Sequence, residues 1–193
     1  KQYYNDNYIL KNKFTELYNV LKLKTKTKKK KKSVVIGNDG WFYLGNEYSS
    51  LVDKNSGHRP LSESELEEIK ESILKKKAFC DSLGIQFIIT LAPDKQSIYT
   101  EFYPYKKYGE SRIEQVDKLL KTMDVNYINI IDTLKVQKKI CDTINIYYKK
   151  DSHWNFHGAW PAYSKIFTKV HQLVPNIKCL TLDDITIVEN QLH

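Results

Sequence analysis

The 193-residue chain lacks the motifs that identify the most common catalytic and metal sites. It contains neither Gly-x-Ser-x-Gly nor Gly-Asp-Ser, so no serine stands in a recognisable nucleophile turn. Its three cysteines form no Cys-x-x-Cys pair, which excludes zinc ribbons and thioredoxin-like sites. No apolar run approaches the roughly 20 residues of a membrane-spanning helix. Motifs alone therefore assign no nucleophile, no zinc centre and no membrane span.

Glycine and proline are also scarce, with seven and five residues, which argues against a fibrous repeat or a disordered chain. Apolar residues make up 41% and charged residues 28%, as in soluble globular domains. The length suits one compact domain. Because the first residue is Lys1 rather than Met, we expect a fragment or a processed chain, with any signal or anchor upstream.

The formal net charge of +8 is concentrated in one place. Seven lysines stand in KTKTKKKKK, at Lys24–Lys32, so the rest of the chain is nearly neutral. A nucleic-acid surface usually places arginine or aromatic residues among its basic charges, and this stretch has neither. We interpret it as a solvated, self-repelling loop and expect no nucleic-acid partner, with attraction to an acidic polymer as the alternative.

The first part of the chain is predicted to form a helix and then a β-hairpin. Apolar residues recur at helical intervals over 7–23, and the lysine stretch ends this segment. Two β-like runs follow, Val34–Ile36 and Trp41–Leu44, joined by a Gly-Asn-Asp-Gly turn whose residues tolerate positive φ. Residues 46–60 are typical of a loop. We therefore expect an N-terminal unit at 1–32, with an amphipathic helix and a lysine-rich loop, and a folded domain at 33–193.

Helices and strands alternate through the rest of the chain. The clearest helix begins at Ser62, which has capping-box spacing from Glu65, and ends at Gly84. The apolar run IQFIITLA then predicts a strand buried on both faces of a parallel sheet. Further helices are predicted over 111–123, about 132–141 and 159–173, with strands at VNYINIID, INIYY and CLTLDDITIVEN. This order predicts an α/β fold with a mostly parallel sheet flanked by helices in three layers.

Chemistry in such sheets gathers at the carboxyl ends of the strands. Two loops of unusual composition follow predicted strands, APDKQSIYTE and KKDSHWN. In the second, Asp151 and His153 are two residues apart and point the same way in an extended chain. A carboxylate beside an imidazole fixes its tautomer and makes the histidine a useful general base. Trp154 could form one side of the pocket around that base. Gly158 and Ala159 are small and would let the next helix approach closely.

Two other interpretations of this turn stay open. In a purely structural turn, Asp151 would cap the following helix while His153 bonds to the backbone. In a metal site, Asp151, His153 and His157 would be ligands, because the two histidines are four residues apart. Trp154 stands where the His-Glu-x-x-His motif has its glutamate, and no fourth ligand is evident.

The remaining nucleophile candidates fit poorly. Ser56 and Ser97 lie in predicted loops without a strand-to-turn elbow before them, and Ser152 would point away from the Asp-His pair. Of the thiols, Cys80 is expected in a helix core, and a single disulfide would join Cys141 and Cys179. We therefore expect the nucleophile to be missing from the chain.

Three stretches together are similar to the SGNH-hydrolase-like domain of alginate O-acetyltransferases, of the AlgJ/AlgX type, and of related exopolysaccharide acetylation proteins. They are VVIGNDGWFYLG, LAPDKQSIYTEFYP and YYKKDSHWNFHGAWPAY, and they come in the family's order and spacing. With the leading helix, the resemblance spans most of residues 7–173. It implies an SGNH/flavodoxin-like domain that is incomplete at the C-terminus, because in this family the Asp-x-His motif precedes the serine.

The resemblance implies acetyl transfer to, or removal from, a polysaccharide hydroxyl through an acyl-enzyme. Asp151 would orient His153, and His153 would activate a serine beyond His193, so this chain alone should be inactive. Lys95 and Tyr99 match recurrent family positions and would line or support the substrate pocket together with Trp154. No metal and no cofactor are expected.

The resemblance also implies partners and a location. The substrate would be a secreted or cell-wall polysaccharide, and a membrane O-acyltransferase could supply the acetyl group. The protein would be bacterial and extracytoplasmic, at the periplasm, the cell surface or outside the cell, with a membrane anchor or signal outside this chain.

Two competing functions remain. A non-catalytic glycan-binding or scaffold domain would use the 14 tyrosines and three tryptophans for stacking on sugars, although core packing accounts for most such residues. Nucleic-acid binding through Lys24–Lys32 is the third hypothesis.

Overall fold

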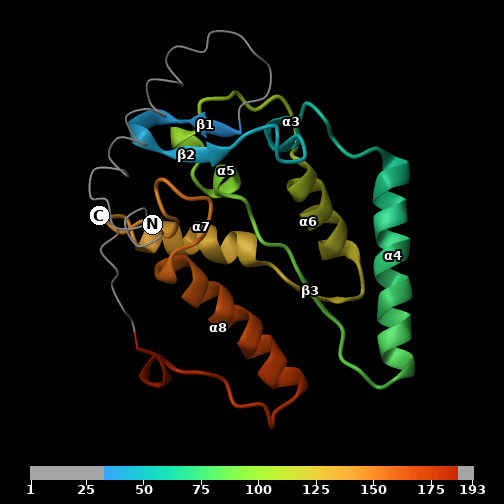
Figure 1. Ribbon diagram of the computed structural model, residues 1–193. Coiled ribbons are helices and arrows are strands. Elements are labelled where there is room, and N and C mark those ends of the chain that lie inside the picture. Colours follow the sequence, from blue (N-terminus) through green and yellow to red (C-terminus); the bar gives the residue numbers. More distant parts are fainter. Residues whose placement is uncertain (1–32, 187–193) are drawn as a thin grey trace, which may run out of the picture. The chain divides into compact units, whose positions relative to one another are not determined.

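The structure is a computed structural model that describes residues 33–186, so the helix predicted over 7–23 and the lysine stretch lie outside the described residues. Figure 1 shows the hairpin of β1 (Val34–Ile36) and β2 (Phe42–Leu44) at the top, next to α3 (Leu51–Ser56) and α5 (Lys95–Ile98). Helices α7 (Ile130–Ile140) and α8 (Phe156–Leu173) lie below them, and α4 (Glu63–Ser82) runs along one side.

The predicted hairpin is confirmed. Strands β1 (Val34–Ile36) and β2 (Phe42–Leu44) pair antiparallel, with Val35 opposite Tyr43. The turn between them is a short 3₁₀ helix, Asn38–Gly40, in which Asp39 and Gly40 have φ angles of 53° and 73°. The Asn-Asp-Gly sequence suits this turn because these residues adopt positive φ at low cost.

The loop expected at residues 46–60 contains a short helix, α3 (Leu51–Ser56). Its N-cap, Ser50, has a φ of 58° and makes no side-chain cap. The sequence therefore carries none of the usual signals of a helix start at this point.

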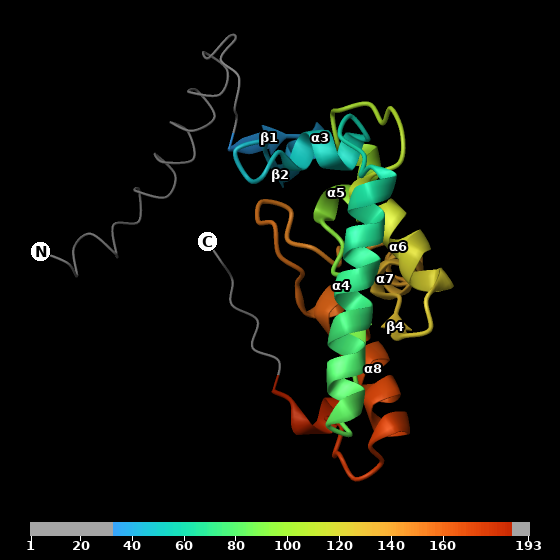
Figure 2. The ribbon, with the colours of Figure 1, turned by 90° about the vertical axis from the view of Figure 1, so that its right-hand side faces the viewer.

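Two longer helices begin as their sequences predict. Helix α4 (Glu63–Ser82) starts at a capping box between Ser62 and Glu65, and α6 (Arg112–Thr122) at one between Ser111 and Glu114. Each box satisfies backbone N–H groups that have no partner within the helix. Helix α4 packs against α6 and, as Figure 2 shows, extends well beyond it.

The parallel sheet is short within the described residues. Strand β3 (Ile88–Thr90) pairs with β4 (Asn126–Ile128), and Ile89 lies opposite Tyr127. The prediction of a strand buried on both faces over 85–92 is wrong here, because β3 is half-buried and Ile85 is exposed. Within residues 33–186 its only strand neighbour is β4.

Two other predicted strands are wrong. In INIYY, Ile146 and Tyr147 are fully buried, but Tyr147 forms only an isolated bridge with Trp154. The apolar run thus reflects burial of its side chains rather than backbone pairing in a β-sheet. Over 179–186 the chain forms a 3₁₀ turn at Leu182–Asp184, because the Asp184 carboxylate accepts hydrogen bonds from the backbone and hydroxyl of Thr181.

The main core lies where the hairpin, α5 (Lys95–Ile98), α7 (Ile130–Ile140) and α8 (Phe156–Leu173) meet. Asparagine caps start both long helices: Asn129 accepts from the backbone of Asp132, and Asn155 from that of Gly158. A 3₁₀ turn, Thr100–Phe102, follows α5. The buried apolar residues of this core are Val35, Trp41, Tyr43, Val52, Ile98, Tyr99, Ile128, Ile130, Leu134, Ile146, Tyr147 and Ala162.

All three cysteines are free thiols, so the predicted Cys141–Cys179 disulfide is wrong. The Cys141 sulfur accepts a hydrogen bond from Gln137, and the Cys179 thiol donates to the Phe167 carbonyl. Cys80, expected in the core, is only half-buried. Among residues 33–186, none of the helices combines the length and apolar character of a membrane span.

Candidate active site

The turn that carries Asp151 and His153 is a closed loop. The loop is closed by an isolated β-bridge between Tyr147 and Trp154. Next to this bridge, Tyr148 N donates to His153 O at 3.2 Å, and Asn155 N donates to Ile146 O at the same distance. These bonds hold residues 148–153, the Asp-His loop, between the buried segment at Ile146 and the start of α8.

The structure brings Asp151 and His153 together. Asp151 Oδ1 lies 2.5 Å from His153 Nδ1 and also accepts from the His153 backbone N–H at 2.8 Å. The backbone hydrogen bond, followed by that of the imidazole, holds the pKa of Asp151 below its usual range. An ionised carboxylate at Nδ1 keeps a proton on that nitrogen and leaves Nε2 as the acceptor.

The described residues show neither the helix cap at Asp151 nor the metal-binding group that the two alternative interpretations of the turn expected. Asn155, not Asp151, caps α8, so a turn in which Asp151 is the helix cap is wrong. Within residues 33–186, no group of three or more His, Cys, Asp or Glu side chains is placed to hold a metal ion. His157 lies on α8 with its ring beside Phe156.

Lys95 lies beneath the Asp-His loop rather than at its surface. Its side chain is buried, at 2% exposed, and its ammonium group donates three hydrogen bonds to carbonyl oxygens of the loop. The acceptors are Tyr148 at 3.0 Å, Lys149 at 3.1 Å and Asp151 at 2.8 Å. The nitrogen also lies 5.3 Å from the Trp41 ring and 5.1 Å from the Tyr43 ring. Burial lowers the pKa of Lys95 to about 8, which leaves the amine mostly protonated at neutral pH.

Tyr99 supports the same loop from the core. Its hydroxyl accepts from the backbone N–H of Ile146 at 3.0 Å, and its carbonyl accepts from the Tyr43 hydroxyl at 2.8 Å. Its ring stacks on Trp41, with centroids 4.3 Å apart. Tyr99 therefore connects the hairpin to the segment that leads into the Asp-His loop.

Trp154 links the two loops that follow the predicted strands. Its Nε1 donates to the Tyr147 hydroxyl at 2.5 Å, and that hydroxyl donates to the Pro93 carbonyl at 2.6 Å. The role of Tyr147 was not predicted, since its only signal was a tyrosine inside an apolar run. The described contacts place Lys95, Tyr99 and Trp154 as supports of the loop, and their contact with substrate stays a prediction.

Gly158 lets α8 come close to the buried segment. A Cβ atom at this position would lie 2.3 Å from the Ile146 carbonyl oxygen, so no larger residue fits. The close approach predicted for Gly158 is therefore seen, whereas Ala159 is exposed.

Residues 34–187 match the family described as SGNH hydrolase-like domain, acetyltransferase AlgX. The chain belongs to this family. No curated protein matches it. Among solved structures, the O-acetyltransferase domain of Pseudomonas putida AlgJ is 18% identical, with a TM-score of 0.51 over 73% of this chain and 48% of that one. Bacillus cereus PatB1 with a sulfonyl adduct is 20% identical, with a TM-score of 0.57 over 79% of this chain and 50% of that one.

These similarities confirm the predicted α/β class and the SGNH-like fold. The chain spans about half the length of the solved structures it matches. The predicted boundary between a unit at 1–32 and a domain at 33–193 stays a prediction.

In this AlgX-type domain the imidazole of the Asp-His pair is open to solvent. The His153 side chain is 82% exposed and that of Asp151 56%. No serine hydroxyl of residues 33–186 hydrogen-bonds the His153 ring. Ser56 donates to the Asp53 carbonyl from the end of α3, and Ser97 lies within α5. The described residues therefore provide an exposed imidazole whose Nε2 can accept a proton, with no serine hydroxyl beside it.

Proposed function

We propose that this chain carries the base half of a Ser-His-Asp site in a polysaccharide O-acetyltransferase or acetylesterase. The observation that carries the proposal is the contact of Asp151 Oδ1 with His153 Nδ1, which leaves Nε2 exposed on a loop fixed by Lys95 and Tyr99. Membership of the AlgX-type family supports acetyl transfer as the chemistry. The nucleophilic serine would come from outside residues 1–193.

In the first half-reaction the serine Oγ attacks the carbonyl carbon of an acetyl ester, and its proton passes to His153 Nε2. The tetrahedral intermediate then loses the donor alcohol, which takes the proton back from Nε2. This leaves an acetyl-serine. Asp151 remains ionised throughout and holds the ring in place.

In the second half-reaction a sugar hydroxyl, or water in an esterase, attacks the acetyl-serine while His153 Nε2 accepts its proton. The serine leaves as an alcohol and recovers a proton from Nε2. The products are an O-acetylated polysaccharide, or acetate, and the free enzyme. The balance needs no metal, cofactor or redox partner.

The relatives support a proposal for the acceptor and the location. Because the family is described by the acetyltransferase AlgX, and one similar structure is the AlgJ O-acetyltransferase domain, we infer a secreted or cell-wall polysaccharide as substrate. A membrane O-acyltransferase would supply the acetyl group. The complete protein would then act outside the cytoplasm, held there by a signal or anchor.

The second candidate is a non-catalytic glycan-binding or scaffold domain of the same acetylation system. The exposed His153, without a serine beside it among residues 33–186, is the observation that favours it. Such a domain would bind glycans, and its complete form would show no ester turnover.

The test is hydrolysis of an aryl acetate by the complete gene product, by its His153→Ala variant and by His157→Ala. His157 is an exposed histidine four residues away and serves as the matched control. The proposal requires turnover by the parent and by His157→Ala, and its loss in His153→Ala. Equal turnover in all three proteins would contradict the role of His153, and no turnover in any would favour the scaffold.

A further inference from the structure

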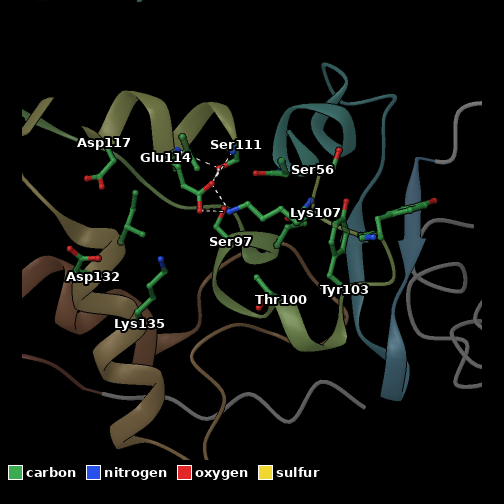
Figure 3. Close-up of a pocket in the computed structure, with 16 residues that line it drawn as sticks. Ser56, Ser97, Thr100, Tyr103, Lys107, Ser111, Glu114, Asp117, Asp132 and Lys135 are labelled. Atoms are coloured by element: carbon green, nitrogen blue, oxygen red, sulfur yellow. Dashed lines mark hydrogen bonds and ion pairs between the residues drawn. The ribbon is translucent and has the colours of Figure 1, made fainter. Parts of the chain in front are cut away.

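A cavity of about 450 Å³ lies among α5, α6 and α7, and no residue of the Asp-His loop lines it. Figure 3 shows that the amine of Lys107 lies at the carboxylate of Glu114, with which it forms an ion pair. The other two carboxylates of the lining, Asp117 and Asp132, are both ion-paired with Lys121. The cavity is thus separate from the proposed base, and a substrate of that base meets this chain at the exposed face of the Asp-His loop.

Tyr148 stands directly opposite His153, at the two ends of the Asp-His loop. The β-bridge pairs Tyr147 with Trp154, so the next residues within the loop, Tyr148 and His153, are cross-strand neighbours. The Tyr148 N–H donates to the His153 carbonyl oxygen at 3.2 Å. Residues that face each other in this way have Cβ atoms about 5 Å apart. The Tyr148 side chain therefore begins next to the proposed base.

The side chains of Tyr148 and His153 extend from the outer face of this two-stranded segment. Successive residues of an extended chain point to opposite faces. Tyr147 and Trp154 point inward, because the Trp154 indole donates to the Tyr147 hydroxyl and that hydroxyl donates to the Pro93 carbonyl. Tyr148 and His153 therefore point outward. Their exposure agrees, since Tyr148 is 47% exposed and the His153 side chain 82%.

The backbone of Tyr148 is held at both of its polar groups, whereas its side chain has no polar or aromatic partner. The N–H donates to His153, and the carbonyl accepts from the buried ammonium group of Lys95 at 3.0 Å. Within residues 33–186, the Tyr148 ring packs on no other aromatic ring and its hydroxyl forms no hydrogen bond. A tyrosine ring on a fixed backbone loses little conformational freedom when a ligand binds to it.

Tyr148 differs in this respect from the three residues that were predicted to contact substrate. Lys95 and Tyr99 are buried, and the indole N–H of Trp154 already has a hydrogen-bond partner. Besides the imidazole of the proposed base, Tyr148 carries the only aromatic ring of the Asp-His loop. Its ring offers a wide apolar face with a polar tip, which suits the C–H face and the hydroxyls of a pyranose.

We propose that Tyr148 binds the acetyl acceptor by stacking on one of its pyranose rings, next to His153. The inference rests on the proposed function in taking the bound sugar to be the acceptor. A ring held there brings its hydroxyls, or those of the next unit, to Nε2 of the base. Stacking uses the C–H face of the sugar, so neutral and acidic pyranoses are both suitable. Binding itself requires neither proton transfer nor the nucleophile.

The test is isothermal titration of the complete gene product with cellotetraose, chitotetraose and tetragalacturonate. The parent is expected to bind at least one of the three probes. Tyr148→Ala and Tyr148→Leu both remove the ring and should weaken that binding about ten-fold, whereas Tyr148→Phe keeps the ring and should stay within about two-fold. Tyr48→Ala is the control, because it changes a tyrosine that is similarly exposed but lies outside the loop, and it should bind like the parent.

Tyr148→Leu keeps an apolar side chain for any contact with the rest of the protein, and thermal unfolding of each variant shows whether it is folded. The stacking role is overturned if no probe binds to the parent, or if Tyr148→Ala or Tyr148→Leu binds like the parent. It is also overturned if Tyr148→Phe loses as much affinity as Tyr148→Ala, because the hydroxyl rather than the ring would then be responsible.

The titration contains no acetyl donor, so its result is independent of turnover. Glycan binding that depends on the Tyr148 ring, without aryl acetate hydrolysis by the parent, would refute the catalytic proposal and keep the stacking residue. Hydrolysis by the parent, with glycan binding that is absent or unchanged in Tyr148→Ala, would do the reverse.

Discussion

The Nζ atom of Lys95 lies 2.8 Å from the carbonyl oxygen of Asp151, inside the loop that carries the proposed base. Two further carbonyls of the same loop accept from this nitrogen. The carboxylate of the same residue, Asp151, holds the His153 ring. A single buried ammonium group therefore sets the position of the backbone from which both side chains of the pair extend.

Replacement of Lys95 by Met should lower the free energy of unfolding by about 3 kcal/mol, because three carbonyls lose a charged donor. Denaturant unfolding of the variant and the parent measures this. Lys139→Met is the control, since Lys139 is exposed and makes no ion pair within residues 33–186, and it should change stability by less than about 0.5 kcal/mol. Equal stabilities of Lys95→Met and the parent would mean that the three hydrogen bonds do not form.

The same lysine predicts a pH dependence of stability. Its pKa falls from 10.5 to about 8 on folding because the side chain is buried, so between these pH values the unfolded chain binds more protons. Stability rises with pH where the unfolded state binds more protons. The stability of the parent relative to Lys95→Met should therefore increase from pH 8 to pH 10.5, as measured by denaturant unfolding at several pH values. A flat or falling difference would contradict the lowered pKa of Lys95.

Replacement of Asp151 by Asn should change the tautomer of His153. The amide can donate to Nδ1, which moves the ring proton to Nε2 and removes the free acceptor. In the complete gene product, aryl acetate turnover should fall by about 10³–10⁴-fold, with an unchanged fold. The ¹⁵N shifts of the imidazole report the tautomer directly. Asp142→Asn, at an exposed carboxylate outside the loop, should alter neither quantity.

Replacement of Gly158 by Ala should destabilise the domain by about 1–3 kcal/mol, because the new Cβ would lie 2.3 Å from the Ile146 carbonyl oxygen. The matched control is Gly109→Ala, whose Cβ would lie 3.7 Å from its nearest neighbour, the Gly57 carbonyl oxygen. Thermal unfolding of the two variants compares them. If both lose the same stability, α8 does not approach the buried segment as closely as the structure has it.

Local features of the fold could be predicted from the sequence, and long-range ones could not. The capping boxes at Ser62 and Ser111 and the turn at Asn38–Gly40 lie within a few residues and follow from residue type. The run at Ile146–Tyr147 was misassigned, because burial of an irregular segment and burial of a strand leave the same apolar pattern. Helix α3 has no sequence signal at its start.

In the candidate site, too, local contacts could be predicted from the sequence and long-range contacts could not. The Asp151–His153 contact joins residues two apart, and the spacing alone suggested it. The support from Lys95 joins residues more than 50 apart, and so does the bond from Tyr147 to Pro93. Because a lysine in a polar loop is usually exposed, its residue type did not indicate that Lys95 would be buried. The cavity of about 450 Å³ lined by residues of α5, α6 and α7 was likewise not predicted, because it needs these helices packed together.

The most direct test of the account is modification of the complete gene product by an arylsulfonyl fluoride, followed by mass spectrometry of the peptides. We expect one sulfonylated serine outside residues 1–193 in the parent and in His157→Ala, and none in His153→Ala. Equal labelling of the His153→Ala variant and the parent, or no labelling of the parent, would contradict the assignment of Asp151 and His153 as the base half of an acyl-transfer site.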